Sequence, residues 1–186
     1  GCKDTHFNNP HGLHDESHYT TARDLAIITQ AALKSENFRQ IVATAEYTIP
    51  ESTLGPEHDL KTTNMLIYNS TGNSLYYSRA TGVKTGYTSA AGRCLIATAE
   101  DGDVRFLSVL CGAKTSIQDT GDLLMESFPE TIKLLDYGFD NFSYVTALSP
   151  LYPIAQVGVL HSAGSEAVAV APAKDVKLLL PANYNP

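Results

Sequence analysis

The stretch TGVKTGYT at residues 81–88 carries side chains suited to binding an anion. Lys84 provides a compact positive charge and Thr85 a hydroxyl donor, a combination that suits a carboxylate. Gly86 has no side chain, so a ligand can approach the backbone closely at that point. A three-residue Lys-Thr-Gly match also arises by chance. Taken alone, these residues favour the simpler interpretation of a solvated lysine beside a glycine bulge.

Strands are predicted to carry and follow this stretch. Residues 81–88, 93–99 and 104–111 have the composition of strands, and Asp101-Gly102 predicts a tight hairpin between the last two. A fourth strand is predicted at residues 46–49, where Pro50 ends the pattern. The strand that holds Lys84 is thus expected to be followed by an antiparallel hairpin.

Apolar residues at helical spacing predict three helices, over residues 22–33, 36–43 and 115–138. Pro129 is expected to kink or restart the third helix. Residues 50–78 are rich in Pro, Gly, Ser, Thr and Asn, so loops are expected there, with one helical turn near residues 64–67.

The composition is that of a globular protein. The chain has 186 residues, of which 43% are hydrophobic and 18% charged. Its net charge of -7 and the lack of a basic run argue against a nucleic-acid partner. No apolar stretch approaches the roughly 20 residues of a membrane span. After Asn141, short β-like runs predict a second module, so the expected domains are residues 1–142 and 143–186.

The three cysteines, Cys2, Cys94 and Cys111, form neither a disulfide framework nor a metal-binding pair in the sequence. Pairing through the Asp101-Gly102 turn is expected to bring Cys111 closer to Gly92 and Arg93 than to Cys94. A disulfide is therefore not expected, and buried free thiols are.

Histidines crowd the first 18 residues and suggest a rival function, because imidazole and carboxylate groups bind metals. The residues concerned are His6, His11, His14 and His18, with Asp15 and Glu16 among them. No helix is predicted there to align two of them. We favour loop histidines that hydrogen-bond to the backbone, with His11 lining the cleft, and no metal.

Taken with its surroundings, the Lys-Thr-Gly stretch closely resembles the serine D-alanyl-D-alanine carboxypeptidases, the low-molecular-mass penicillin-binding proteins. The order and spacing of five segments carry the resemblance, at residues 5–13 (THFNNPHGL), 19–26, 63–64, 82–88 and 91–92. The resemblance implies an α/β (α+β) fold: a partial penicillin-binding or β-lactamase-like catalytic domain with an antiparallel sheet and helices. The tail is then the start of a β-rich domain.

In that family a serine attacks the bond between two D-alanines of the peptidoglycan stem peptide, and water hydrolyses the acyl-enzyme. The resemblance implies that Lys84 and Thr85 bind the terminal carboxylate and that Gly86 and Tyr87 pair with the peptide backbone. The Tyr87 N–H is implied as an oxyanion donor. Lys84 and Tyr87 are thus the candidate catalytic residues, and His11 joins Lys84, Thr85, Gly86 and Tyr87 as substrate-binding.

The resemblance implies no metal or organic cofactor. β-Lactams are expected to bind the intact parent enzyme as substrate mimics. The parent is expected to act outside the cytoplasmic membrane, in the cell envelope, and this chain shows neither a signal peptide nor an anchor.

Two of the three family motifs, S-x-x-K and S-x-N, are missing where they are needed. No serine is followed by lysine at the third position, and the S-x-N match at Ser35-Glu36-Asn37 is misplaced. Lys61-Thr62-Thr63 and Lys114-Thr115-Ser116 are near misses to K-T-G. The chain is therefore expected to be the C-terminal part of such an enzyme, without its nucleophile. The alternative is a non-catalytic peptidoglycan-binding or assembly module.

A missing N-terminal part is expected to uncover apolar surface on the sheet and helices, at Ile96, Leu107, Val109, Leu124 and Leu135. Something should then cover this surface: the missing segment as a separate chain, a rearranged N-terminal stretch, or a second copy of the chain. A homodimer through an open strand edge is our preferred form.

The missing motifs generate a direct prediction. Penicillin should not acylate the 186-residue chain, because no serine has an activating lysine three residues on. Incubation with labelled penicillin followed by intact-mass measurement checks this. A stoichiometric adduct would contradict the prediction and require a different nucleophile.

Overall fold

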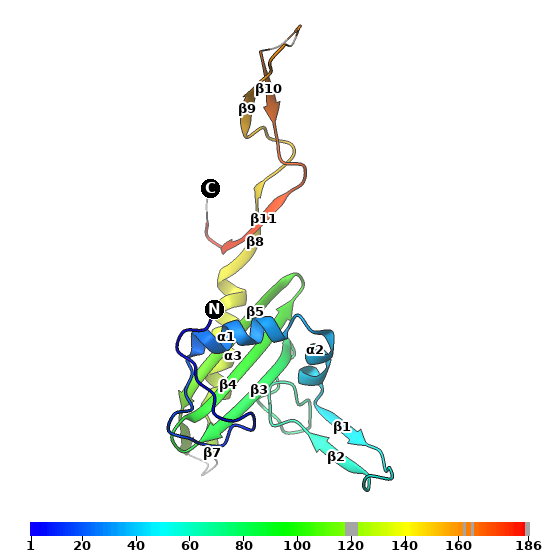
Figure 1. Ribbon diagram of the computed structural model, residues 1–186, viewed down its shortest axis with the longest axis vertical. Coiled ribbons are helices and arrows are strands. Elements are labelled where there is room, and N and C mark those ends of the chain that lie inside the picture. Colours follow the sequence, from blue (N-terminus) through cyan, green and yellow to red (C-terminus); the bar gives the residue numbers. More distant parts are fainter. Residues whose placement is uncertain (118–122, 162, 165, 185–186) are drawn as a thin grey trace. The chain divides into compact units, whose positions relative to one another are not determined.

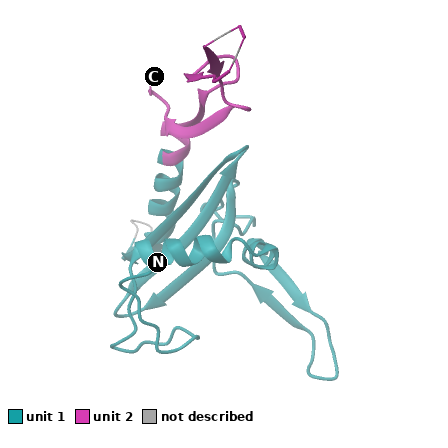
Figure 2. Cartoon of the chain, turned by 45° about the horizontal axis from the view of Figure 1, so that its top comes forward, with its two compact units in different colours: residues 1–137 teal, residues 138–186 magenta. Residues whose placement is uncertain are grey.

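The computed structural model describes residues 1–117, 123–161, 163–164 and 166–184. The chain divides into two compact units, Gly1–Tyr137 and Gly138–Pro186 (Figure 2). The mixed α/β class and the antiparallel pairing that the sequence predicts are confirmed. That residues 143–186 begin a separate β-rich domain stays a prediction.

The first unit is built around a three-stranded antiparallel sheet in the order β3-β4-β5. β3 spans Ala80–Thr88, β4 spans Gly92–Asp101 and β5 spans Val104–Ala113. The predicted hairpin is confirmed, but Asp101 pairs with Val104, so the two turn residues are Gly102 and Asp103 rather than Asp101 and Gly102. β3 lies at one edge of this sheet, and Lys84 is at the middle of β3.

The two faces of the sheet are covered to different extents. Leu95, Ala97 and Ala99 alternate along β4 and are completely buried on one face. Helix α3, Ser127–Asn141, passes behind the strands in Figure 1, and its Phe128 is also buried. Helix α1, Ala22–Ala32, crosses the front and packs against β5. On this front face Ile96 of β4 is only half-buried.

The predicted exposure of the five apolar side chains is wrong for Leu135, which is 1% exposed. Leu135 belongs to the same buried apolar set as Phe128 of α3 and the alternating residues of β4. The other four residues are half-buried, namely Ile96, Leu107, Val109 and Leu124. A homodimer or a separate covering chain therefore stays a prediction.

Local sequence explains where α1 and α2 begin. The Thr21 hydroxyl accepts a hydrogen bond from the Asp24 amide at 3.1 Å and caps α1. Ser35 caps α2, Glu36–Ala43, through the amide of Phe38 at 3.4 Å. The C-terminal end of α2 packs against β3 at Gly82, whose φ is +148°. A Cβ on Gly82 would lie 2.9 Å from a methyl carbon of Val42, so only glycine permits this approach.

The predicted strand at residues 46–49 is confirmed as β1, Glu46–Ile49. A second strand, β2 (His58–Lys61), lies in the region expected to be loops and pairs with β1 in a hairpin. The charged sequence HDLK has little strand character by itself, and all four of its residues are exposed. Backbone pairing with β1 makes it a strand.

The predicted helix over residues 115–138 is wrong in its first half, of which residues 118–122 lie outside the described residues. Thr115–Ile117 forms β6, which pairs with β7, Leu123–Met125, before α3 begins. Thr115 and Ile117 are β-branched, which favours a strand. Pro129 lies in the first turn of α3, where a missing N–H costs no helical hydrogen bond, so it starts the helix rather than kinking it.

The predicted placement of the cysteines is also wrong. Leu95 pairs with Leu110 and Arg93 with Ala113, with a register shift between them. Cys94 therefore lies across from Cys111 and Gly112 in a β-bulge. The turn lies at Gly102-Asp103 rather than at Asp101-Gly102, and this shift moves the residue opposite Cys111 by two positions, from Gly92 to Cys94.

The second unit contains two antiparallel strand pairs. β8, Phe142–Leu148, pairs with β11, Val176–Pro181. Between them along the chain, β9 (Ala155–Gly158) pairs with β10 (Ala167–Val170). These strands confirm the β-like runs that the sequence predicts after Asn141.

The buried carboxylate of Asp24 fastens the N-terminal segment to α1. One of its oxygens, Oδ2, accepts hydrogen bonds from the Lys3 amide at 3.1 Å, the Asp4 amide at 2.8 Å and the Thr5 hydroxyl at 2.7 Å. Asp24 is 2% exposed. The Thr5 bond, followed by the Asp4 bond, lowers the pKa of Asp24 below its usual 3.8.

Replacing Leu95, which is completely buried at the centre of the sheet, should destabilise the first unit. Leu95→Ala is expected to lower the free energy of unfolding by about 2–5 kcal/mol, because it removes buried methyl groups and leaves a cavity. Urea unfolding measures this change. The matched control is Leu54→Ala at a side chain that is 97% exposed, where the change should stay within about 0.5 kcal/mol.

The Asp24 interactions should make stability depend on pH. The folded pKa is depressed, so the carboxylate stabilises the fold above its unfolded pKa, and this contribution is lost as the pH falls through the folded pKa. Asp24→Asn should therefore lower the thermal midpoint at pH 7, and the gap from the wild type should close on acidification. A constant gap from pH 7 to pH 2 would contradict this account.

Candidate functional site

Lys84 and Thr85 lie side by side on β3, and the structure places them at the border of one cavity. The Lys84 ammonium is exposed and donates to the Thr85 carbonyl oxygen, with 2.6 Å between Nζ and O. The Thr85 and Thr63 hydroxyls hydrogen-bond to each other. Among the described residues, no strand pairs with the outer edge of β3. A cation, two hydroxyls and an open strand edge therefore face the same region.

The cavity beside these groups has a volume of about 480 Å³. It is lined by Thr63, Lys84, Thr85, Gly86, Tyr87, Arg93, Cys94, Met125, Ser127 and Phe128. Four of the five predicted site residues thus border one space. Its buried wall comes from Ser127 and Phe128 at the start of α3, while Lys84 lies at the exposed side. This arrangement can hold an anionic group with an apolar neighbour.

Sequence reasoning missed Arg93 as a second cation of the cavity. Its guanidinium carbon lies 4.4 Å from the centre of the Tyr87 ring, a cation–π contact. Arg93 Nε also donates to the Thr115 hydroxyl at 3.3 Å. Tyr87 pairs with Arg93 across β3 and β4, so the hairpin spacing held the signal. The pair adds positive charge next to the Gly86 backbone.

Thr63 is the second residue that the sequence analysis did not assign to the site. It borders the cavity through its hydroxyl bond to Thr85. The neighbouring Lys61 is used elsewhere, because its ammonium lies 3.9 Å from the centre of the Tyr68 ring and 3.8 Å from Glu46. The near-miss tripeptide at residues 61–63 therefore contributes its last residue to the site.

His11 is not among the residues that line this cavity, and its predicted role stays a prediction. Its Nδ1 accepts a hydrogen bond from the Leu13 amide at 3.1 Å. His6 Nε2 hydrogen-bonds with Asn8 Oδ1 at 2.7 Å, and the Asn8 amide donates to His18 Nδ1 at 3.2 Å. In the described part of the chain, no three His, Cys, Asp or Glu side chains are grouped to hold a metal ion.

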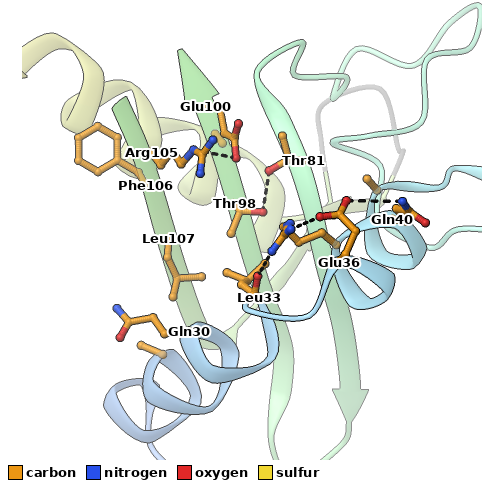
Figure 3. Close-up of a pocket in the computed structure, with 14 residues that line it drawn as sticks. Gln30, Leu33, Glu36, Gln40, Thr81, Thr98, Glu100, Arg105, Phe106 and Leu107 are labelled. Atoms are coloured by element: carbon orange, nitrogen blue, oxygen red, sulfur yellow. Dashed lines mark hydrogen bonds and ion pairs between the residues drawn. The ribbon is translucent and has the colours of Figure 1, made fainter. Parts of the chain in front are cut away.

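A larger cavity of about 650 Å³ lies between α1, α2 and the sheet and shares no lining residue with the Lys84 cavity (Figure 3). Its charged groups neutralise one another. Arg105 pairs with Glu100 at 3.2 Å, and Arg39 pairs with Glu36. The Thr81 hydroxyl donates to Thr98 at 2.8 Å. This cavity therefore offers less unused charge than the Lys84 cavity.

Comparison with known proteins identifies the family. The family description of D-alanyl-D-alanine carboxypeptidases matches residues 1–115. The chain is 36% identical over 152 residues to the D-alanyl-D-alanine carboxypeptidase DacF of Bacillus subtilis, covering 82% of this chain and 34% of that protein. It is 31% identical over 184 residues to DacA of Escherichia coli, covering 97% and 40% respectively. The chain therefore belongs to the D-alanyl-D-alanine carboxypeptidase family, as its motifs predict.

A solved structure agrees with this assignment. Penicillin-binding protein 5 from Haemophilus influenzae matches with a TM-score of 0.68 and 27% identity, over 98% of this chain and 48% of that one. The chain spans 34% and 40% of the length of the two relatives above. Within its described residues, no helix combines the length and apolar character needed to cross a membrane.

Proposed function

We propose that the chain supplies the substrate-binding strand of a serine-type D-alanyl-D-alanine carboxypeptidase. The intact enzyme would remove the terminal D-alanine from peptidoglycan stem peptides and act in the cell envelope. The observation that carries the proposal is the meeting of Lys84, Thr85 and an open strand edge at one cavity, in a member of this family.

Lys84 and Thr85 would bind the terminal carboxylate of the substrate. An ammonium and a hydroxyl together neutralise and orient a carboxylate, and the Thr63 hydroxyl can orient that of Thr85. Binding requires Lys84 Nζ to exchange the Thr85 carbonyl for the ligand, a stronger charge-assisted partner. The outer edge of β3 at Gly86 and Tyr87 would hydrogen-bond to the peptide backbone, as an added strand does.

Tyr87 would supply a backbone N–H to the oxyanion that forms when the serine attacks the peptide carbonyl. No serine in the 186 residues has the S-x-x-K spacing, so residues outside the printed sequence would provide the nucleophile and its lysine. The serine oxygen would form an ester with the acyl group as the bond between the two D-alanines breaks, and the terminal D-alanine would depart with a proton on its amine. Water would then hydrolyse the ester, release the shortened peptide and restore the serine. β-Lactams would enter as substrate mimics by the same route.

Lys84→Ala in the intact enzyme tests the proposal. Loss of a charge-assisted hydrogen bond in a partly desolvated site should cost about 1.5–3 kcal/mol, or about ten- to a hundredfold in kcat/KM. The measurement is release of D-alanine from a synthetic peptide that ends in D-Ala-D-Ala. Unchanged turnover and substrate affinity would overturn the assignment.

Lys61→Ala is the matched control. Lys61 is also an exposed strand lysine, but it lies over Tyr68 and lines none of the cavities described above. Its replacement should leave kcat/KM close to that of the wild type. Equal losses in the two variants would point to a general effect of surface charge rather than to a carboxylate site.

A further inference from the structure

Cys94 and Cys111 lie opposite each other on β4 and β5, in the same sheet as β3, the strand that carries Lys84. Cys94 pairs with Gly86 of β3 on one side. On its other side it faces Cys111 across the β4–β5 bulge, between the Leu95–Leu110 and Arg93–Ala113 pairs. Both cysteines are free thiols and line the same cavity of about 550 Å³. Cys94 also lines the Lys84 cavity, but the function proposed for that cavity uses neither thiol.

The backbone at this point suits a cross-strand bridge. Residues directly opposite in an antiparallel pair have Cα atoms about 4.5–5.5 Å apart. Disulfides span about 4.4–6.8 Å between Cα atoms, so the two ranges overlap. Glycines also bring the strands close here, because a Cβ on Gly92 would lie 3.1 Å from the Cα of Gly112. The bulge departs from regular spacing, but the two cysteines lie where β4 and β5 approach closely, as a cross-strand bridge requires.

The two side chains also interact. Partial loss of solvation, then the charge of Cys94 and a hydrogen bond with it, raises the pKa of the Cys111 thiol. The Cys94 thiol is oriented by weak contacts of 3.8 Å and 4.0 Å to the Ala91 and Gly92 carbonyl oxygens. Cys111 is exposed and Cys94 half-buried, so a small oxidant can reach the pair from solvent.

We propose that Cys94 and Cys111 form a dithiol site that takes an intramolecular disulfide bond by exchange with a small disulfide oxidant such as oxidised glutathione. The proposal does not depend on the carboxypeptidase activity. The bridge would join β4 to β5 beside Gly86, because Cys94 is the residue that pairs with Gly86. This couples the oxidation state of the dithiol site to the backbone that borders the Lys84 cavity.

The exchange balances in two steps. One cysteine thiolate attacks a sulfur of the oxidant, forms a mixed disulfide and releases the first glutathione thiol. The second cysteine thiolate then attacks the protein sulfur of that mixed disulfide, forms the Cys94–Cys111 bond and releases the second glutathione thiol. Two electrons pass from the protein to the oxidant, and the protons of the two cysteines end on the two glutathione molecules.

The test is incubation of the folded 186-residue chain with oxidised glutathione at mildly alkaline pH, where the raised pKa of Cys111 still allows thiolate to form. Intact mass should show the loss of two hydrogens for the bridge, apart from any glutathione that the unpaired, exposed Cys2 takes up. Peptide mapping should link Cys94 to Cys111, and dithiothreitol should reverse the change.

Matched variants separate a paired site from scattered thiols. Cys2→Ser should still form the bridge, with thiols falling from two to none. Cys94→Ser should instead accumulate a glutathione adduct on Cys111. In a fixed glutathione redox buffer, the bridged fraction should be larger for the folded chain than for the chain in urea. Stable glutathione adducts on both cysteines of the wild type, bridging only between molecules, or equal bridging in urea would overturn the proposal.

Discussion

The pairing of β3 with β4 is the interaction that places the residues from Lys84 to Tyr87, together with Arg93 and Cys94, in the candidate site. β4 is fixed by the complete burial of Leu95, Ala97 and Ala99, since a slip of one residue would turn these side chains to the less covered face. β3 takes its register from β4, which places Lys84 opposite Ile96 and Gly86 opposite Cys94. The buried residues of β4 thereby determine the position of the exposed Lys84 ammonium.

The same register brings together groups that act on the two sides of β4. Toward β3 it sets Arg93 beside Tyr87 and so adds a second cation to the cavity that Lys84 borders. Toward β5 it sets Cys94 against Cys111. Oxidation of the thiols and binding of a ligand at Lys84 would then both act on the same short stretch of β4, residues 93–95. The proposed binding site and the proposed dithiol site therefore both depend on β4, but they use different reactive side chains.

Packing around the strand is as specific as the pairing within it. The absence of a side chain at Gly82 lets Val42 of α2 lie against β3, and the three hydrogen bonds to Asp24 hold residues 3–5 against α1. Both contacts lie within the first unit, which contains residues 1–115, the part that the family description matches. The contact at Gly82 packs α2 against β3, the strand that borders the Lys84 cavity, although neither contact reaches the cavity itself.

The sequence by itself determined the family, the three strands around Lys84, the Asp101-Gly102 hairpin and both short helices, because these depend on local periodicity, turn chemistry and motif order. It also named four residues of the cavity. Only the tertiary structure decided the strand at 58–61 and the β6–β7 pair, since backbone pairing with distant residues outweighs weak local preference. It alone brought Arg93 to Tyr87, Thr63 to Thr85 and Cys94 to Cys111, because such contacts follow from register and bulge geometry between segments separated along the chain.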